Sequence, residues 1–171
     1  MKKLLLIIAL ALITSMSFSQ NPFPKGRNQL NFGVGLSGWG VPVYIGIDHG
    51  MGNDFSIGGE FSYRSYNEKW GNDNDRYYDY NHNIMGFSGN VNYHFNRILQ
   101  MPSNWDFYAG LNLGFYVWNS PNDYVGNHSS GLGLGGQIGG RYYFSDKVGI
   151  NLEFGGNNAF NGGKFGLTIK I

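Results

Sequence analysis

Hydrophobic and polar residues alternate with a period of two along most of the chain. Between Leu30 and Leu36 every second residue is a large apolar one, and the residues between them are Asn or Gly. Such alternation is typical of a β-strand with one apolar and one polar face. The pattern recurs in eight stretches, which are 30–36, 41–47, 55–64, 85–95, 107–117, 132–144, 148–154 and 165–171. The sequence therefore predicts eight strands.

No stretch after Gln20 has the spacing of an amphipathic helix, and no apolar run there approaches the ~18 residues of a membrane helix. A short connection over 145–147 indicates a hairpin. Gly-rich strands at an open sheet edge would expose unpaired backbone groups, and closing the sheet removes such edges. We therefore predict an all-β fold, an eight-stranded antiparallel up-and-down β-barrel.

The polar face of the strands distinguishes a soluble barrel from a transmembrane one. A surface in water normally carries many charged side chains, whereas this face is mostly Gly, Asn and Ser. Small residues suit the narrow interior of an eight-stranded barrel, which side chains can fill. We therefore predict a transmembrane barrel with a filled lumen and no open pore. Two polar pairs are predicted inside it, Glu60 with Arg64 and Arg141 with Glu153.

Composition agrees with this interpretation. Of the 171 residues, 13% are charged, 17% are aromatic and 28 are Gly, a mixture unlike that of an ordinary cytosolic enzyme. The chain has no Cys, which excludes disulfides, thiolate zinc sites and cysteine nucleophiles. Two of the 12 basic residues lie in the export segment described next, which leaves 10 against 11 acidic residues. This balance gives no electrostatic basis for binding nucleic acid.

Residues 1–19 have the parts of a secretory signal peptide. Two lysines precede an apolar run over residues 4–13, and small serines flank Phe18 at the expected cleavage site. That run is too short for a membrane helix, which needs ~20 residues. We predict cleavage near Ser19 and a single barrel domain over 20–171.

The signal peptide, the eight stretches and a last strand reading Lys-Phe-Gly-Leu-Thr-Ile-Lys-Ile over 164–171 resemble the small outer-membrane β-barrel family of Gram-negative bacteria, the OmpA/OmpX-like, porin-type barrels. The resemblance covers the whole mature chain and rests on pattern, not on a specific motif. It implies a place in the cell outer membrane, insertion by the barrel-assembly machinery, and contact with outer-membrane lipid and lipopolysaccharide. Ile171 replaces the family's usual terminal aromatic residue. The expected role is structural or one of surface interaction, without catalysis or a cofactor.

All four Trp residues lie at or just beyond the ends of predicted strands. Trp and Tyr at strand ends are typical of the aromatic girdles of membrane barrels. We predict that four side chains lie at the membrane interface, those of Trp39, Trp70, Trp105 and Trp118.

The predicted outward connections are a short one at 38–40 and longer ones at 67–82, 119–130 and 157–163, and the inward ones are 49–54, 96–105 and 145–147. The inward connection 96–105 is longer than this class of barrel leads us to expect. The 67–82 connection is rich in Asp, Asn and Tyr, and we predict it to contact an extracellular ligand. It lacks the EF-hand pattern, so no metal site is predicted there. The contact candidates are Asp73, Asp75, Tyr77, Tyr78 and Asp79.

Two other functions stay open on the sequence alone. His128 and Ser130 have the His-x-Ser spacing of outer-membrane lipid A deacylases, in which a Ser–His–acid arrangement permits acyl transfer. The other is a soluble exported barrel that binds a lipophilic ligand within an inward apolar face.

Two further patterns predict no site. The glycines of 131–136 resemble a phosphate-binding loop only superficially, because no helix follows them. The four histidines lie in separate segments without metal-ligand spacing, and His94 is predicted to form hydrogen bonds in the lumen. They are His49, His82, His94 and His128.

Overall fold

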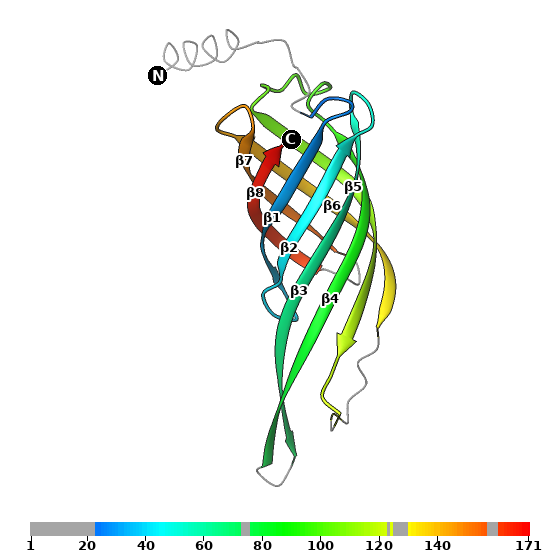
Figure 1. Ribbon diagram of the computed structural model, residues 1–171, viewed down its shortest axis with the longest axis vertical. Helices are drawn as coiled ribbons and strands as arrows, with labels where there is room; N and C mark the ends of the chain where they lie inside the picture. Colours follow the sequence, from blue (N-terminus) through cyan, green and yellow to red (C-terminus); the bar gives the residue numbers. More distant parts are fainter. Residues whose placement is uncertain (1–22, 73–75, 123, 125–129, 157–160) are drawn as a thin grey trace, which may run out of the picture.

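The computed structural model shows a closed barrel of eight antiparallel strands, each hydrogen-bonded to its neighbours in chain order (Figure 1). It describes residues 23–72, 76–122, 124, 130–156 and 161–171, with the backbone alone between 70 and 78. Pairing of the first strand with the last closes the barrel, so the predicted fold is confirmed. The strands are β1 (Asn28–Ser37), β2 (Val43–Gly50), β3 (Phe55–Asn72), β4 (Arg76–His94), β5 (Trp105–Asn119), β6 (Gly131–Tyr143), β7 (Val148–Gly156) and β8 (Asn161–Lys170).

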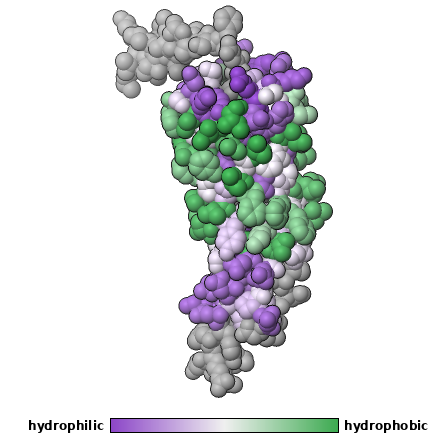
Figure 2. Space-filling model, viewed as in Figure 1, coloured by the Kyte–Doolittle hydropathy of each residue, from purple (hydrophilic) through white to green (hydrophobic). Residues whose placement is uncertain are grey.

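Large apolar side chains point outward from every strand. Leu134 on β6 is 75% exposed and Ile45 on β2 is 53% exposed, although both lie within hydrogen-bonded strands. The positions between such residues point inward and bury polar side chains, Arg141 and Thr168 among them. On the outer surface the apolar residues form a band between two hydrophilic ends (Figure 2). The inward face is polar, which contradicts a soluble barrel with a lipophilic ligand inside.

The strands extend much further at one end of the barrel than at the other. The connections between β2 and β3, β4 and β5, and β6 and β7 lie at the end where β8 finishes, and β3 and β4 project far beyond the barrel wall at the other end (Figure 1). β3 has 18 residues and β4 has 19, whereas β1 and β8 have 10 each. A strand of about 9–11 residues is enough to cross a bilayer. The outer halves of β3 and β4 therefore extend past any bilayer that the band could fit.

The predicted connection over 67–82 is wrong in its extent, because β3 and β4 stay paired up to Asn72 and Arg76. The alternation ends earlier than the pairing because both faces of a projecting ribbon meet water, so nothing selects for an apolar face. The backbone hydrogen bonds between β3 and β4 do not require an apolar face, so they continue along the projecting ribbon.

The inward connection over 96–105 has an ordered structure. The amides of Leu99 and Met101 donate hydrogen bonds to the carbonyls of Phe95 and Asn96, each at 2.9 Å. Nε of Arg97 donates to Oδ1 of Asp54 at 3.0 Å, which links this connection to the neighbouring turn before β3. The hydrogen bonds and the charge of Asp54 raise the pKa of Arg97. No helix in the described part of the chain is long and apolar enough to cross a membrane.

Replacing Gly139 by Ala should destabilise the barrel by about 1–3 kcal/mol, the range for overpacking a filled interior. A Cβ at Gly139 would lie 2.3 Å from Cζ of Tyr108, which is fully buried. Gly136→Ala on the outward face of the same strand is the matched control, because its nearest neighbour would lie 3.7 Å away. Urea unfolding in lipid vesicles measures both variants. Equal losses of stability in the two variants would show that the lumen beside Tyr108 can accommodate an added methyl group.

Candidate functional site: the lumen and its two ends

Lys164 on β8 lies between two carboxylates in the middle of the lumen. Its Nζ is 2.8 Å from Oε2 of Glu60 and 2.7 Å from Oε1 of Glu153. The hydroxyl of Tyr108 donates to the other oxygen of Glu153 at 2.8 Å. These side chains come from β3, β5, β7 and β8, so the cluster links strands on different sides of the barrel.

Arg141 on β6 forms a second cluster. Its guanidinium lies 2.6 Å from Oδ2 of Asp48 and 3.0 Å from Oδ2 of Asp106, and all three side chains are buried. The same guanidinium lies 4.2 Å from the centre of the Tyr108 ring. Each carboxylate removed from water thus meets a cation, as buried charges require.

All four residues predicted as lumen pairs line the interior, but the predicted pairing is wrong. Glu60 pairs with Lys164 instead of Arg64, and Arg141 pairs with Asp48 and Asp106 instead of Glu153. Arg64 lies nearer the outer mouth, where it donates to Oγ of Ser37 at 3.2 Å and its guanidinium lies 5.5 Å from the Trp39 ring. Position along a strand sets the height of a side chain in the barrel. It does not show which distant strand presents the opposite charge at that height.

Ser56, His94 and Asp106 form a hydrogen-bonded chain at the inward end of the lumen. Nε2 of His94 lies 2.9 Å from Oγ of Ser56, and Nδ1 lies 2.7 Å from Oδ1 of Asp106. This is the order of groups in a serine hydrolase triad. All three are buried, and the buried ring of Phe23 lies 6.0 Å from the His94 ring. The burial leaves Ser56 no surface for a substrate. The prediction that His94 forms hydrogen bonds in the lumen is confirmed.

Side-chain amides fill the lumen beside these charges. Asn112 donates to Gln137 at 2.9 Å, and Gln137 donates to Asn92 at 2.6 Å. The cavity enclosed by Tyr44, Tyr108 and the charged clusters holds only about 10 Å³, the space of one water molecule. The interior is filled by side chains, as predicted.

The outer mouth is packed with aromatic rings around His82. The His82 ring lies 4.6 Å from that of Tyr124 and 5.4 Å from that of Trp118, and its Nε2 lies 3.4 Å from Oε2 of Glu68. Tyr124, from the connection between β5 and β6, donates its hydroxyl to the same Glu68 oxygen at 3.0 Å. Loss of hydration and this hydrogen bond raise the pKa of Tyr124 to about 12. Tyr124 therefore packs on the outer part of β3 and β4.

The four predicted interface Trp residues have different positions. Trp105 is 39% exposed on the outer face of β5, and it packs against Phe107 and Tyr142 at the inward rim. The prediction is wrong for Trp118, which shares the inward face of β5 with Tyr108 and packs on His82. Trp39 is 38% exposed and lies against Trp118 at 5.5 Å. The side chain of Trp70 is outside the described part.

Most of the predicted contact residues cannot be placed. Asp73 and Asp75 lie outside the described residues, as do the side chains of Tyr77 and Tyr78, and Asp79 is exposed on the outer part of β4. His128 also lies outside them, and Oγ of Ser130 accepts a hydrogen bond from the Trp118 amide at 3.2 Å. The glycines of 131–136 belong to β6 and form no phosphate loop. No group of three His, Asp or Glu residues in the described part is placed to hold a metal ion.

Comparison with solved structures identifies the same architecture elsewhere. The outer membrane protein OprG from Pseudomonas aeruginosa superposes with a TM-score of 0.67 at 9% identity, covering 88% of this chain and 99% of that one. The chain has the fold of the small outer-membrane β-barrels. The N-terminal β-barrel domain of Pseudomonas aeruginosa OprF gives 0.56 at 12% identity, covering 86% and 98%. Ail of Yersinia pestis, in complex with the heparin analogue sucrose octasulfate, gives 0.54 at 12% identity, covering 86% and 99%. Neither a protein-family model nor a curated protein matches the sequence.

Proposed function

We propose that the chain is an integral protein of the outer membrane, with a structural role in the envelope and a surface-contact role at its outer end, and that it is not an enzyme. The observation that carries this proposal is the inverted polarity of the barrel. Strand side chains such as Leu134 and Ile45 are exposed on the outside, while Arg141, Asp106 and Thr168 are buried inside. Exposing so many apolar residues to water is unfavourable, and exposing them to lipid is not.

The outer end supplies the contact surface in this proposal. The β3–β4 ribbon projects beyond the apolar band (Figure 1), and Tyr124 donates its hydroxyl to Glu68 on this ribbon. The complex of Ail with a heparin analogue is an example of a barrel of this fold that holds an anionic sugar ligand. The proposal further includes a signal peptide over 1–19, assembly by the barrel-assembly machinery, and contact with lipopolysaccharide.

Refolding the mature chain in detergent tests the membrane placement. Samples run on an SDS gel without boiling are expected to migrate faster than boiled ones, because a closed barrel resists unfolding in SDS. Membranes of expressing cells are expected to retain the protein through a carbonate wash, and its N-terminus is expected at Gln20 by mass spectrometry. Release by carbonate together with no heat-dependent shift would refute the placement.

The Ser56–His94–Asp106 chain gives a separate test of the non-enzymatic role. Fluorophosphonate probes are expected to label the wild-type barrel no more than Ser56→Ala, because the hydroxyl of Ser56 is fully buried. Lipid A from cells producing either form is expected to have the same mass. Labelling that disappears in Ser56→Ala, or a lipid A species lost with it, would make the chain a hydrolase.

A further inference from the structure

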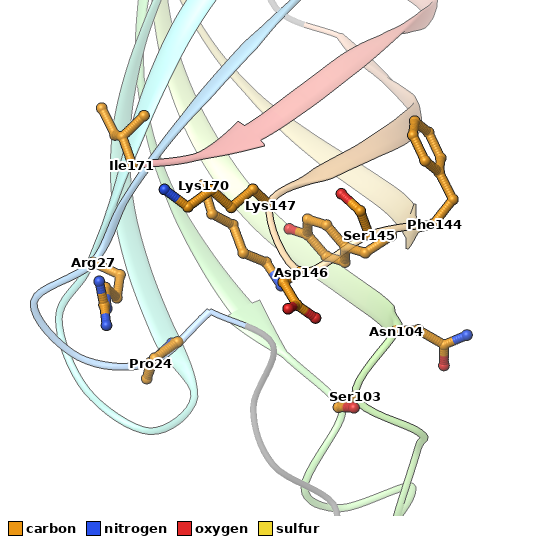
Figure 3. A pocket seen from close by; sticks show the side chains of 11 residues that line it. Pro24, Arg27, Ser103, Asn104, Phe144, Ser145, Asp146, Lys147, Lys170 and Ile171 are labelled. Carbon is orange, nitrogen blue, oxygen red and sulfur yellow. The ribbon is translucent and has the colours of Figure 1, made fainter.

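A cavity of about 550 Å³ opens at the inward end of the barrel (Figure 3). Its walls come from the segment before β1, the turn between β6 and β7, the end of β8, and the connection before β5. Its volume is within the range of small-molecule sites, about 300–1,000 Å³. It is also more than fifty times larger than the space left in the lumen centre.

Three cations line this cavity against one acidic side chain. Arg27, Lys147 and Lys170 contribute positive charge, and Asp146 is the acidic residue. The lysine side chains run across the middle of the cavity, with Arg27 on the opposite wall (Figure 3). A concave surface with excess positive charge concentrates its field and attracts anions.

These cations differ from those of the lumen in how they are paired. Lys170 is attracted by the carboxylates of Asp106 and Asp146, but neither forms an ion pair with it among the described residues. Arg141 and Lys164 each bind two carboxylates, whereas none of the three cavity cations makes an ion pair with any residue that the structure describes. The ammonium of Lys170 lies 3.5 Å from the centre of the Tyr143 ring, a contact that holds the charge at the cavity wall without neutralising it. The charged side chains of the lumen are thus paired with one another, whereas the cavity at the inward end has an excess of positive charge.

The rim of the cavity indicates where the anion comes from. Phe144 and Ile171 also line it, are 60% and 54% exposed, and point away from its middle (Figure 3). Trp105 and Tyr142 pack together on the outer face of the same end, which is the arrangement of an interfacial girdle. A cationic hollow beside an apolar rim suits a ligand with an anionic head and an acyl tail.

We propose that this cavity binds a phosphate group, that of a phospholipid in the periplasmic leaflet of the membrane. A phosphate group offers several acceptor oxygens, so it can accept hydrogen bonds from more than one of the cations that line the cavity. The lipid source rests on the proposed membrane placement of the barrel, whereas the phosphate site itself does not.

Backbone NMR shifts of the refolded mature chain in neutral detergent test the proposal. The probes are inorganic phosphate and a short-chain phosphatidylglycerol, and the reporters are the amides of Ser145, Lys147 and Lys170. Lys147→Gln is expected to weaken binding of the lipid about tenfold, as for the loss of one charge-assisted hydrogen bond. Lys25→Gln is the matched control, because Lys25 is an exposed cation on the same segment as Arg27 and does not line the cavity.

Each outcome decides a different part of the proposal. Tighter binding of the lipid than of phosphate, weakened by Lys147→Gln and not by Lys25→Gln, supports the phospholipid. Equal or tighter binding of inorganic phosphate with the same pattern of variants supports the phosphate site and overturns the lipid source. No binding of either probe, or equal losses in both variants, overturns the site. The heat-dependent gel shift of the same samples reports separately on the barrel.

Discussion

Replacing Lys164 by Met is expected to lower the free energy of unfolding by about 3–5 kcal/mol, the cost of leaving a buried charge without its partner. Lys164 is the cation between Glu60 and Glu153, at 2.8 and 2.7 Å. Glu153 would keep only the hydroxyl of Tyr108, and Glu60 would have no partner in the described structure. Urea unfolding in lipid vesicles, followed by Trp fluorescence, measures the change.

A rescue experiment shows whether unpaired charge causes the loss. Adding Glu60→Gln and Glu153→Gln to the Lys164→Met variant removes both carboxylates while preserving most of the side-chain volume. Stability is expected to return most of the way, because neutral amides cost much less than ions in a closed lumen. Lys69→Gln on the exposed outer part of β3 is the control for losing one lysine, with an expected effect within about 0.5 kcal/mol. A Lys164→Met barrel as stable as this control would mean that water reaches the cluster.

Alternation along the chain was enough to predict the fold, and the small residues on the polar face showed that this face lies inside. Only an inverted barrel places Gly, Asn and Ser on one face of every strand and large apolar residues on the other. The same alternation also places Trp118 on the inner face, since it has the parity of Tyr108. Its position at a strand end led to the wrong assignment to the interface. Parity is the stronger evidence because it follows directly from strand geometry.

The partners inside the lumen could not be read from the sequence. Lys164 and Glu60 are 104 residues apart, and Arg141 and Asp48 are 93 apart. Their meeting depends on the register of every hairpin around the barrel, and a slip of one residue would turn a side chain to the other face. Because the connections differ in length, the sequence does not show which residues of neighbouring strands pair. The β3–β4 ribbon is an example, since its two strands stay paired further than the alternation predicts.

Arg141→Met is expected to cost about as much as Lys164→Met, again about 3–5 kcal/mol, for the same reason at a different pair of carboxylates. The guanidinium holds Asp48 at 2.6 Å and Asp106 at 3.0 Å. Arg141→Lys keeps the charge but not the fork that contacts both carboxylates. Its loss of stability should therefore fall between those of wild type and Arg141→Met, and the same urea titration compares the three.

The two carboxylates should respond differently once Arg141 is gone. Asp106 keeps the ring of His94 at 2.7 Å, whereas Asp48 keeps only the amide of Asn31 at 2.9 Å. Asp48→Asn should therefore recover more stability in the Arg141→Met background than Asp106→Asn does. The reverse order would mean that His94 does not stabilise the Asp106 carboxylate. Arg141 would then be the group that balances the negative charge of Asp106 in the Ser56–His94–Asp106 chain. Either order shows whether His94 stabilises the Asp106 carboxylate once Arg141 is removed. At the inward end of the lumen His94 lies between the hydroxyl of Ser56 and this carboxylate.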